Sequence, residues 1–239
     1  MVRLSYDLHI HSCLSPCGDD DMLPSNIVGM AALKELDVIA VTDHNSCLNC
    51  PAVMKLAEAY GVTAIPGMEL TTAEEVHVVC LFPTLEKALE FSEYVYSKLL
   101  PFPNDETVFG KQQIVDEDDN VVGKVENLLI NATDIYFYEL YDLLKEYDGL
   151  MIPAHVDKSA NSLLSNLGFI PPDSRFKTAE IKHIGFMEDI LEKNPYLKDC
   201  VIISDSDAHY LENINEPINF IEAESKSIAD VFKALRGKE

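Results

Sequence analysis

The feature that most constrains the fold is the regular alternation of short apolar strands with amphipathic helices along the chain. Val38 to Val41 is a run of apolar, mostly β-branched residues, typical of a strand buried on both faces of a parallel sheet. Leu85 to Leu100 instead repeats its apolar residues at helical spacing. Strand followed by helix recurs about seven times, which favours either a parallel sheet closed as a barrel or an open, doubly wound sheet.

Histidines and isolated carboxylates fall where the predicted strands end. His9 and His11 lie two residues apart at the end of the first strand, so both imidazoles point to the same side. The carboxyl ends of barrel strands form one rim, where active sites are built. Imidazole suits Zn, Fe and Mn, so convergence there predicts a multinuclear metal site. The full set is His9, His11, His44, Glu69, His77, His155, Asp207 and His209.

Each signal also has a plainer interpretation. The two histidines of the first strand fit a solvated strand edge, and His77 fits a satisfied core position. The acidic run at 19–21 lacks the spacing of an EF-hand and fits a solvated loop. Cys47 and Cys50 form a CxxC that fits a zinc or redox pair, although packing is the favoured interpretation. Independent core histidines, however, would not fall so regularly at strand ends.

Composition limits the class of protein. At 239 residues the chain is expected to form one domain, 1–239, with a hairpin insertion at about 101–132. Neither a membrane-spanning run nor a signal peptide is recognisable, so we expect a cytoplasmic protein with reduced cysteines and no membrane partner. The net charge of −23 argues against extended nucleic acid as a partner.

Four motifs, in this order along the chain, resemble those of the polymerase-and-histidinol-phosphatase (PHP) superfamily. They are Asp7-Leu-His-Ile-His-Ser12, Thr42-Asp-His44, Pro153-Ala-His155 and Ser206-Asp-Ala-His209. The resemblance implies a distorted seven-stranded α/β barrel, similar to a TIM barrel, with two or three divalent metal ions of Zn, Fe or Mn. It also implies a metal-dependent phosphoesterase.

The resemblance further implies a ligand set for each metal. His9, His11, Glu69 and Asp207 would hold the first, and Glu69, His77 and His155 the second, so that Glu69 bridges them. His44, His209 and one residue of the loop after His11 would hold a third. Cys17 is the candidate from that loop, with Asp19 second, and a thiolate would favour Zn or Fe over Mn.

Further residues complete the expected site. Such a cluster activates water and clamps phosphoryl oxygens, so His9, His11, Glu69, His155 and Asp207 are the candidate catalytic residues. Lys158 and Arg175 are candidates for binding the substrate phosphate. Asp43, Glu180 and Asp205 are expected to orient ligand histidines from behind.

Three functions compete at this stage. The first is hydrolysis of a small phosphomonoester, such as a nucleotide, a nucleoside bisphosphate or histidinol phosphate. The second is an exonuclease acting on nucleic acid ends. The third is a metal-binding regulatory protein without turnover, which the complete ligand set argues against.

Overall fold

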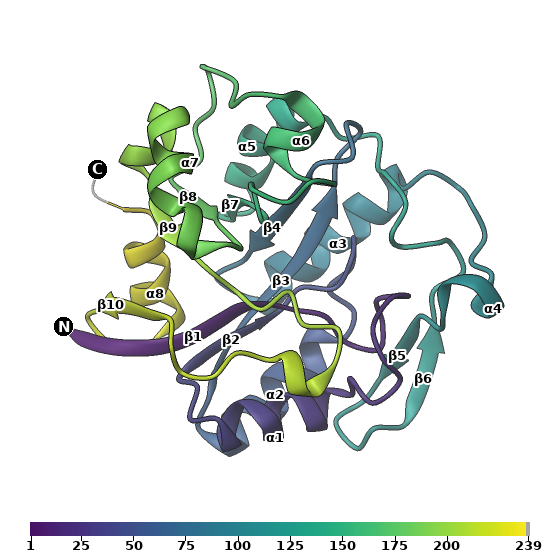
Figure 1. The fold of residues 1–239 in the computed structure, drawn as a ribbon. Helices are drawn as coiled ribbons and strands as arrows, with labels where there is room; N and C mark the ends of the chain where they lie inside the picture. Colours follow the sequence, from purple (N-terminus) through teal and green to yellow (C-terminus); the bar gives the residue numbers. More distant parts are fainter. Residues whose placement is uncertain (238–239) are drawn as a thin grey trace.

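The computed structural model describes residues 1–237, and its centre is a curled six-stranded sheet (Figure 1). The strand order is β10-β1-β2-β3-β4-β7. The bounds are β1 (Val2–Ile10), β2 (Val38–Val41), β3 (Thr63–Thr71), β4 (His77–Leu81), β7 (Leu150–Pro153) and β10 (Phe220–Ala223). A separate parallel pair, β8 (Thr178–Glu180) and β9 (Val201–Ile203), follows in the chain.

The directions of the strands correct the expectation of an all-parallel sheet. β1, β2 and β3 are parallel, whereas β4 is antiparallel to both β3 and β7, and β10 is antiparallel to β1. The segment between β3 and β4 is too short for the helical crossover that a parallel neighbour needs. As a result the start of β4 lies at the same edge as the end of β3, and His77 is paired with Thr71.

The prediction of an α/β fold with a curled, barrel-like sheet is therefore confirmed. Among residues 1–237 the strands form a half-barrel of six strands and a neighbouring pair, and not one closed barrel of seven strands. The described chain also has eight α-helices: α1 (Pro24–Leu33), α2 (Cys50–Tyr60), α3 (Leu85–Lys98), α4 (Glu106–Phe109), α5 (Phe137–Glu146), α6 (Leu163–Leu167), α7 (Met187–Lys193) and α8 (Ile228–Leu235). Three short 3-10 turns lie at Ile184–Phe186, Pro195–Asp199 and Leu211–Asn213.

Two apolar layers cover the outside of the sheet. In Figure 1, α1 and α2 lie on one side of it and α5, α6 and α7 on the other. Ile27 and Val53 from the first pair pack with Ile39 of β2. Phe91 of α3 and Leu140 of α5 pack with residues of β3 and β4. Burial of these apolar faces is what holds the helices against the sheet.

The concave side of the sheet has its own apolar core. Leu4, Tyr6 and Leu8 of β1 face Ile152 of β7 there, and α8 contributes Phe232 to the same cluster. Since α8 packs against β10 and β3, it closes one end of the half-barrel. Polar side chains are left to gather at the other end, where β1, β2 and β3 finish.

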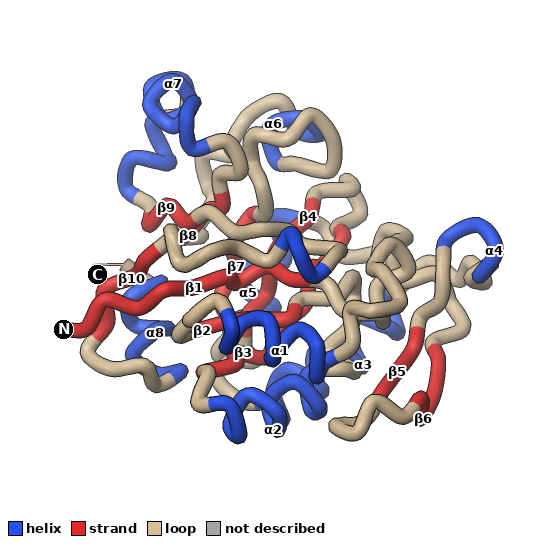
Figure 2. The backbone as a smooth tube through the Cα atoms, turned by 60° about the horizontal axis from the view of Figure 1, so that its bottom comes forward, coloured by secondary structure: helices blue, strands red, loops and turns tan. Residues whose placement is uncertain are grey.

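A hairpin of β5 (Gln113–Val115) and β6 (Val121–Lys124) stands beside the main sheet (Figure 2). The buried Asn49 side chain accepts a hydrogen bond from Val115 N (3.0 Å) and so ties the hairpin to the start of α2. Asn45 similarly donates to Leu129 O (2.7 Å). The region 101–132 thus packs next to the polar end of the sheet. Within the described chain, no helix has the length and apolarity required to cross a membrane.

Candidate metal centre

The Glu69 carboxylate is the centre of the polar cluster. It is buried, and nitrogens of five histidines lie within 3.4 Å of its two oxygens. Oε1 is 2.8 Å from His77 Nδ1, and Oε2 is 3.1 Å from His44 Nδ1. The remaining nitrogens are Nε2 of His9, His11 and His155, at 3.3, 3.4 and 3.2 Å. Histidines from β1, the β2 end, β4 and the β7 end therefore converge on one residue of β3.

Close packing of β3 fixes the position of Glu69. A Cβ at Gly67 would meet Cys80 O and the Leu81 side chain at 2.7 Å, so only glycine lets β3 approach β4 this closely. The Glu69 amide then donates to Asp43 O (3.0 Å), which joins the strand to the loop that carries His44. These backbone contacts fix the position of the Glu69 carboxylate relative to β4 and to the loop that carries His44.

An irregularity in β1 directs its two histidines. The register with β2 shifts between Asp7 and Ile10, so one additional β1 residue lies there, and such bulges re-aim side chains beside active sites. His9 and His11 end with their Nε2 atoms 3.2 Å apart. Their other ring nitrogens are held from behind. His9 Nδ1 contacts Glu180 Oε2 (2.8 Å), and His11 Nδ1 contacts Ser15 Oγ (2.9 Å).

Asp43 has no hydrogen bond to a histidine side chain in the described chain and instead holds Ser15, which contacts His11. Its Oδ1 accepts from Ser15 Oγ (2.7 Å) and from Ser12 N (2.7 Å), and its Oδ2 accepts from Ser12 Oγ (2.6 Å). The buried carboxylate therefore fixes the turn after β1. Ser15, which the sequence analysis did not select, is the residue in contact with the imidazole.

Asp207 and His209 come from the loop after β9. Asp7 of β1 holds that loop by accepting from Ser206 N (3.0 Å) and Asn215 N (2.9 Å). Asp207 Oδ1 lies 3.3 Å from His11 Nε2. The Asp207 carbonyl accepts a hydrogen bond from His209 Nδ1 (2.9 Å), so His209 Nε2 is available to bind a metal. Asp207 (φ 51°) and His155 (φ 29°) both have left-handed backbones, a strain that clusters at functional sites.

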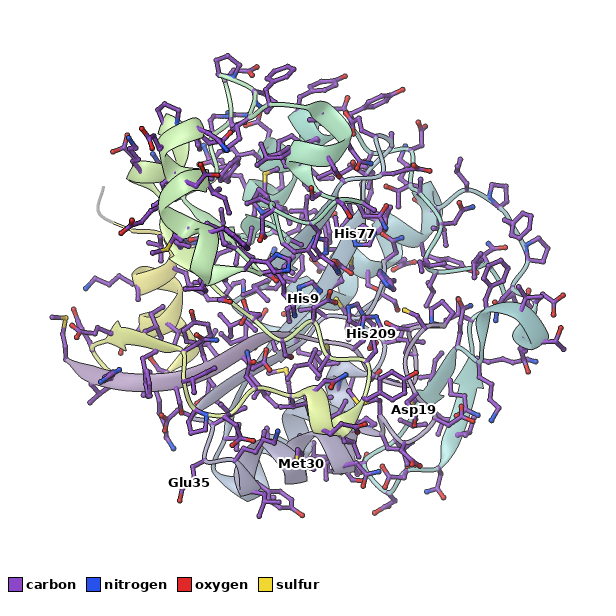
Figure 3. The ribbon with its side chains drawn as sticks, viewed as in Figure 1. His9, Asp19, Met30, Glu35, His77 and His209 are labelled. Atoms are coloured by element: carbon purple, nitrogen blue, oxygen red, sulfur yellow. The ribbon has the colours of Figure 1, made fainter. Side chains whose placement is uncertain are left out.

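Figure 3 shows three of these residues, His9, His77 and His209, together in the middle of the molecule. They lie well away from the labelled Met30 of α1 and from Glu35, which follows that helix. The rings of His11 and His209 stack with centroids 4.2 Å apart. Side chains from both ends of the sequence thus share one site.

The electrostatics favour metal-binding protonation states at most positions. Burial opposes ionisation of Glu69, but His77, His9 and His44 outweigh it and hold its pKa well below the usual range. Burial lowers the pKa of His44, and it lowers that of His209 to about 4. His9 differs: burial opposes its charged form, but Glu180 and the other carboxylates raise its pKa. Neutral imidazoles and ionised carboxylates are the forms that ligate metals, and binding would displace the His9 proton.

The donor set fits divalent metals. Three overlapping groups have ligand atoms within 4.8 Å of one another: His11-His44-His209, His9-His11-Glu69 and His44-Glu69-His77. The buried Nδ1 atoms of His44 and His155 have no hydrogen-bond partner in the described chain. Nitrogen and carboxylate donors of this kind suit Zn, Fe and Mn.

Four candidate ligands lie outside these groups: His155 and Asp207, which contact Glu69 and His11, and the loop residues Cys17 and Asp19. Cys17 is exposed as a residue, and burial of its thiol, followed by Glu69, raises the thiol pKa to about 12. The Asp19 carboxylate accepts from Asp21 N (3.0 Å), while its own amide bonds to His209 O (3.0 Å). A Cβ at Gly18 would meet Ser12 O at 2.3 Å, so this loop is folded tightly against the turn after β1.

The two predicted phosphate-binding cations are placed differently. Lys158 Nζ lies 2.6 Å from Asp207 Oδ2, at the edge of the cluster. Arg175 instead forms a bidentate pair with Asp142 (2.8 and 2.6 Å) over the Tyr141 ring, and no hydrogen bond or ion pair links it to the cluster in the described chain. Its position in the chain indicated a loop but not the direction of the side chain.

Asp205 is buried and accepts from Leu8 N (2.5 Å), so it holds the β1 backbone and not a ligand imidazole. Asp157 and His183, which were not predicted as site residues, form a 2.7 Å pair, and His183 lines the same cavity as His155. The proximity of Asp157 to His155 in sequence was the available signal. The position of His183 became clear only in three dimensions.

The fold and site define an α/β protein with a buried cluster of histidines and carboxylates that could hold divalent metal ions. The PHP domain model matches residues 7–160, and the chain belongs to the PHP domain family. The earlier resemblance to this family is confirmed.

Relatives of known structure share this fold. The lesion-specific endonuclease PfuEndoQ of Pyrococcus furiosus is 21% identical with a TM-score of 0.69, covering 100% of this chain and 57% of that one. A two-domain Bacteroides vulgatus protein containing a predicted PHP-like metal-dependent phosphoesterase is 18% identical, with a TM-score of 0.55 and coverage of 98% and 63%. Uncharacterized protein MJ1587 of Methanocaldococcus jannaschii is 36% identical over 76 residues, 28% of this chain and 44% of that protein. The chain thus spans less than two thirds of each of these relatives.

One of these likenesses corrects the expectation about nucleic acid. Endonuclease Q has also been solved with a 27-mer duplex that places an abasic lesion at its active site, and that structure matches 100% of this chain at 20% identity and a TM-score of 0.68. The expectation, based on the net charge, that extended nucleic acid is an unlikely partner is therefore wrong. A total charge does not describe the local field at a metal site, where bound cations dominate.

Proposed function

We propose that this protein is a metal-dependent phosphoesterase whose reaction takes place at the Glu69 cluster. The observation that carries the proposal is the convergence of five histidine nitrogens on one buried carboxylate. A buried carboxylate among so many imidazoles has little structural purpose without a cation to share. Asp207, beside His9 and His11, adds a second carboxylate to the same set.

We assign two or three divalent ions, of Zn, Fe or Mn, to this set. His9, His11, Glu69 and Asp207 would hold one, and Glu69, His77 and His155 another. His44 and His209 would hold a third, with Cys17 or Asp19 as the remaining ligand. When bound, the metals supply an activated water and clamp phosphoryl oxygens.

The surrounding residues would orient this ligand set and hold the substrate. Glu180 fixes the His9 ring, and Asp43 fixes the His11 ring through Ser15. Lys158, which is half-buried and paired with Asp207, would bind a phosphate oxygen as a point charge. Outer partners of this kind orient ligands and raise their basicity.

The favoured substrate is a small phosphomonoester, such as a nucleotide, a nucleoside bisphosphate or histidinol phosphate. A cavity of about 330 Å³ adjoins the cluster and is lined by His77, His155 and Lys158, and it has room for a small ester. Cleavage of a nucleic acid strand is the second candidate function. The fold shared with endonuclease Q, solved on a DNA duplex, favours it.

The test is a single panel run on purified protein with Zn, Fe or Mn restored. Phosphate release from phosphomonoesters is measured beside strand cleavage of single-stranded, duplex and abasic DNA. Release of phosphate that EDTA abolishes supports the monoesterase, and metal-dependent strand cleavage supports the nuclease. Metal binding without turnover of any phosphoester would contradict both.

A further inference from the structure

A cavity next to the metal centre is lined on one side by His77 and His155, both in contact with Glu69. Lys158, Ser159, Asn161 and His183 form the rest of its wall, with Ala160. An ester whose phosphate sits at the metal cluster would therefore place its leaving group within reach of this second wall. The side chains there are candidates for handling the leaving oxygen.

His183 is the one histidine of the seven in this chain that does not belong to the cluster. It follows β8, the strand whose Glu180 holds His9. Asp157 holds His183 at two points and the preceding residue, Lys182, at a third. Oδ2 contacts His183 Nδ1 (2.7 Å) and accepts from His183 N (2.8 Å), while Oδ1 accepts from Lys182 N (2.7 Å).

The pairing of His183 Nδ1 with Asp157 leaves the other ring nitrogen, Nε2, available for a hydrogen bond to a substrate. When Nδ1 donates its hydrogen bond to Asp157 Oδ2, Nε2 has no hydrogen-bond partner among residues 1–237. The side chain is 58% exposed, so it can exchange protons with water. A carboxylate on Nδ1 fixes the tautomer and stabilises the imidazolium, as it does in other catalytic Asp–His pairs.

An exposed ion pair on a surface loop is the plainer interpretation, and such pairs add little to stability. Two features separate Asp157 and His183 from such a pair. Backbone amides lock the carboxylate, and the carboxylate lies two residues after His155. The pair is thereby held at the wall that the metal-ligand candidates share.

We propose that His183 is the general acid that protonates the leaving oxygen of the phosphoester, and this rests on the proposed phosphoesterase function. The oxygen of water forms the new P–O bond while the bond from phosphorus to the leaving oxygen breaks. The electron pair of that bond stays on the leaving oxygen, which takes the Nε2 proton and departs as an alcohol. The attacking water loses a proton to solvent, and His183 regains one from solvent.

The test compares two leaving groups in a His183→Gln variant. An alkyl phosphate expels a basic alkoxide that needs a proton, whereas para-nitrophenyl phosphate expels a stable anion that does not. Loss of a general acid costs about 100-fold or more in rate. We expect that loss in kcat for the alkyl ester and only a small change for the nitrophenyl ester.

Two further variants and two measurements without turnover serve as controls. Asp157→Asn should give the same leaving-group dependence with a smaller loss, since the imidazolium loses its carboxylate. Asp189→Asn, which breaks an exposed pair with Lys193 on α7, should leave both rates unchanged. Metal content should remain at the wild-type level in His183→Gln. In histidine-labelled apoprotein at alkaline pH, NMR should show the His183 proton on Nδ1, and a proton on Nε2 would contradict the pairing.

The outcomes separate the two proposals. An active wild type in which His183→Gln slows both esters equally, or neither, would overturn the general acid and leave the phosphoesterase standing. A drop in metal content in His183→Gln would also overturn it, because the role would then be structural. Wild-type protein that hydrolyses no phosphoester would overturn the proposed function and this inference with it.

Discussion

The histidine cluster around Glu69 and the cysteine cluster of Cys47, Cys50 and Cys80 are both buried groups of potential metal ligands. In the first, side chains from separate elements point at one another. In the second, each thiol points at a backbone carbonyl: Cys47 and Cys50 share Gly67 O (3.2 and 3.5 Å), and Cys80 takes Val78 O (3.5 Å). The two cysteines of the CxxC are therefore packing residues, whereas histidines that are scattered along the sequence come together as a candidate metal site.

Burial itself explains part of the difference. Moving a group out of water disfavours its charged form. For His44 and His209 that form is the cation, so burial lowers the pKa and leaves the neutral ligand. For Cys47 and Cys80 it is the thiolate, so burial raises the pKa and retains the proton. Burial therefore favours the metal-binding form of these two imidazoles and disfavours the metal-binding form of these two thiols.

Glu69→Gln should have the largest effect on the histidine cluster. The variant removes the negative charge that five imidazoles contact. Mutation of a residue that only hydrogen-bonds to a metal ligand costs up to about 100-fold in metal affinity, so loss of a ligand itself should cost more than that. Titration with Zn or Mn by calorimetry, with circular dichroism as the check on folding, measures this. Unchanged affinity in a folded variant would remove Glu69 from the centre.

Glu180→Gln should have a smaller effect. Glu180 reaches the metals only through His9 Nδ1, so affinity should fall by about 10- to 100-fold. The same titration measures it, and Glu188→Gln on the exposed face of α7 is the matched control. An effect as small as that of the control would mean that Glu180 does not orient the imidazole.

Cys17→Ser should remove part of the metal. If its thiol completes the third ligand set, the purified variant should hold about one equivalent less than wild type. Elemental analysis of both proteins is the measurement. Equal content in the two proteins would assign the role to Asp19 or indicate a site for two metals.

Acid should destabilise the metal-free protein through His209. Its pKa is lowered from the ordinary 6.5 to about 4, so the unfolded chain binds a proton that the folded one excludes between those values. Stability from this residue is therefore lost as pH falls from 6.5 towards 4, with a slope of at most about 1.4 kcal/mol per pH unit. Urea unfolding of apoprotein and of His209→Ala should show a shallower slope in the variant, and an identical slope would contradict the assignment.

Cys50→Ser should have the smallest effect on metal binding. A hydroxyl can still donate to Gly67 O, so we expect unchanged metal content and a loss of about 1 kcal/mol in stability. Thermal unfolding and elemental analysis test the two parts separately. Loss of metal from the folded variant would make the cysteine cluster part of the site.

The sequence predicted which residue types would converge because strand ends share an edge. It did not predict that β4 runs antiparallel, since only the short segment before His77 distinguishes a turn from a crossover. The sequence also does not indicate the direction in which a loop side chain points. Lys158 reaches the cluster and Arg175 turns to Asp142, although both are cations in loops. His183 was missed because its partner Asp157 lies far away in sequence.

The most direct measurement is the metal content of three purified proteins: wild type, Glu69→Gln and the double variant Cys47→Ser with Cys50→Ser. We predict two or three equivalents in the wild type and in the cysteine variant. In Glu69→Gln we predict at most the one equivalent that the third ligand set, which does not include Glu69, would hold. A full complement of metal in Glu69→Gln, together with its loss from the double cysteine variant, would contradict the assignment of the histidine cluster as the metal centre.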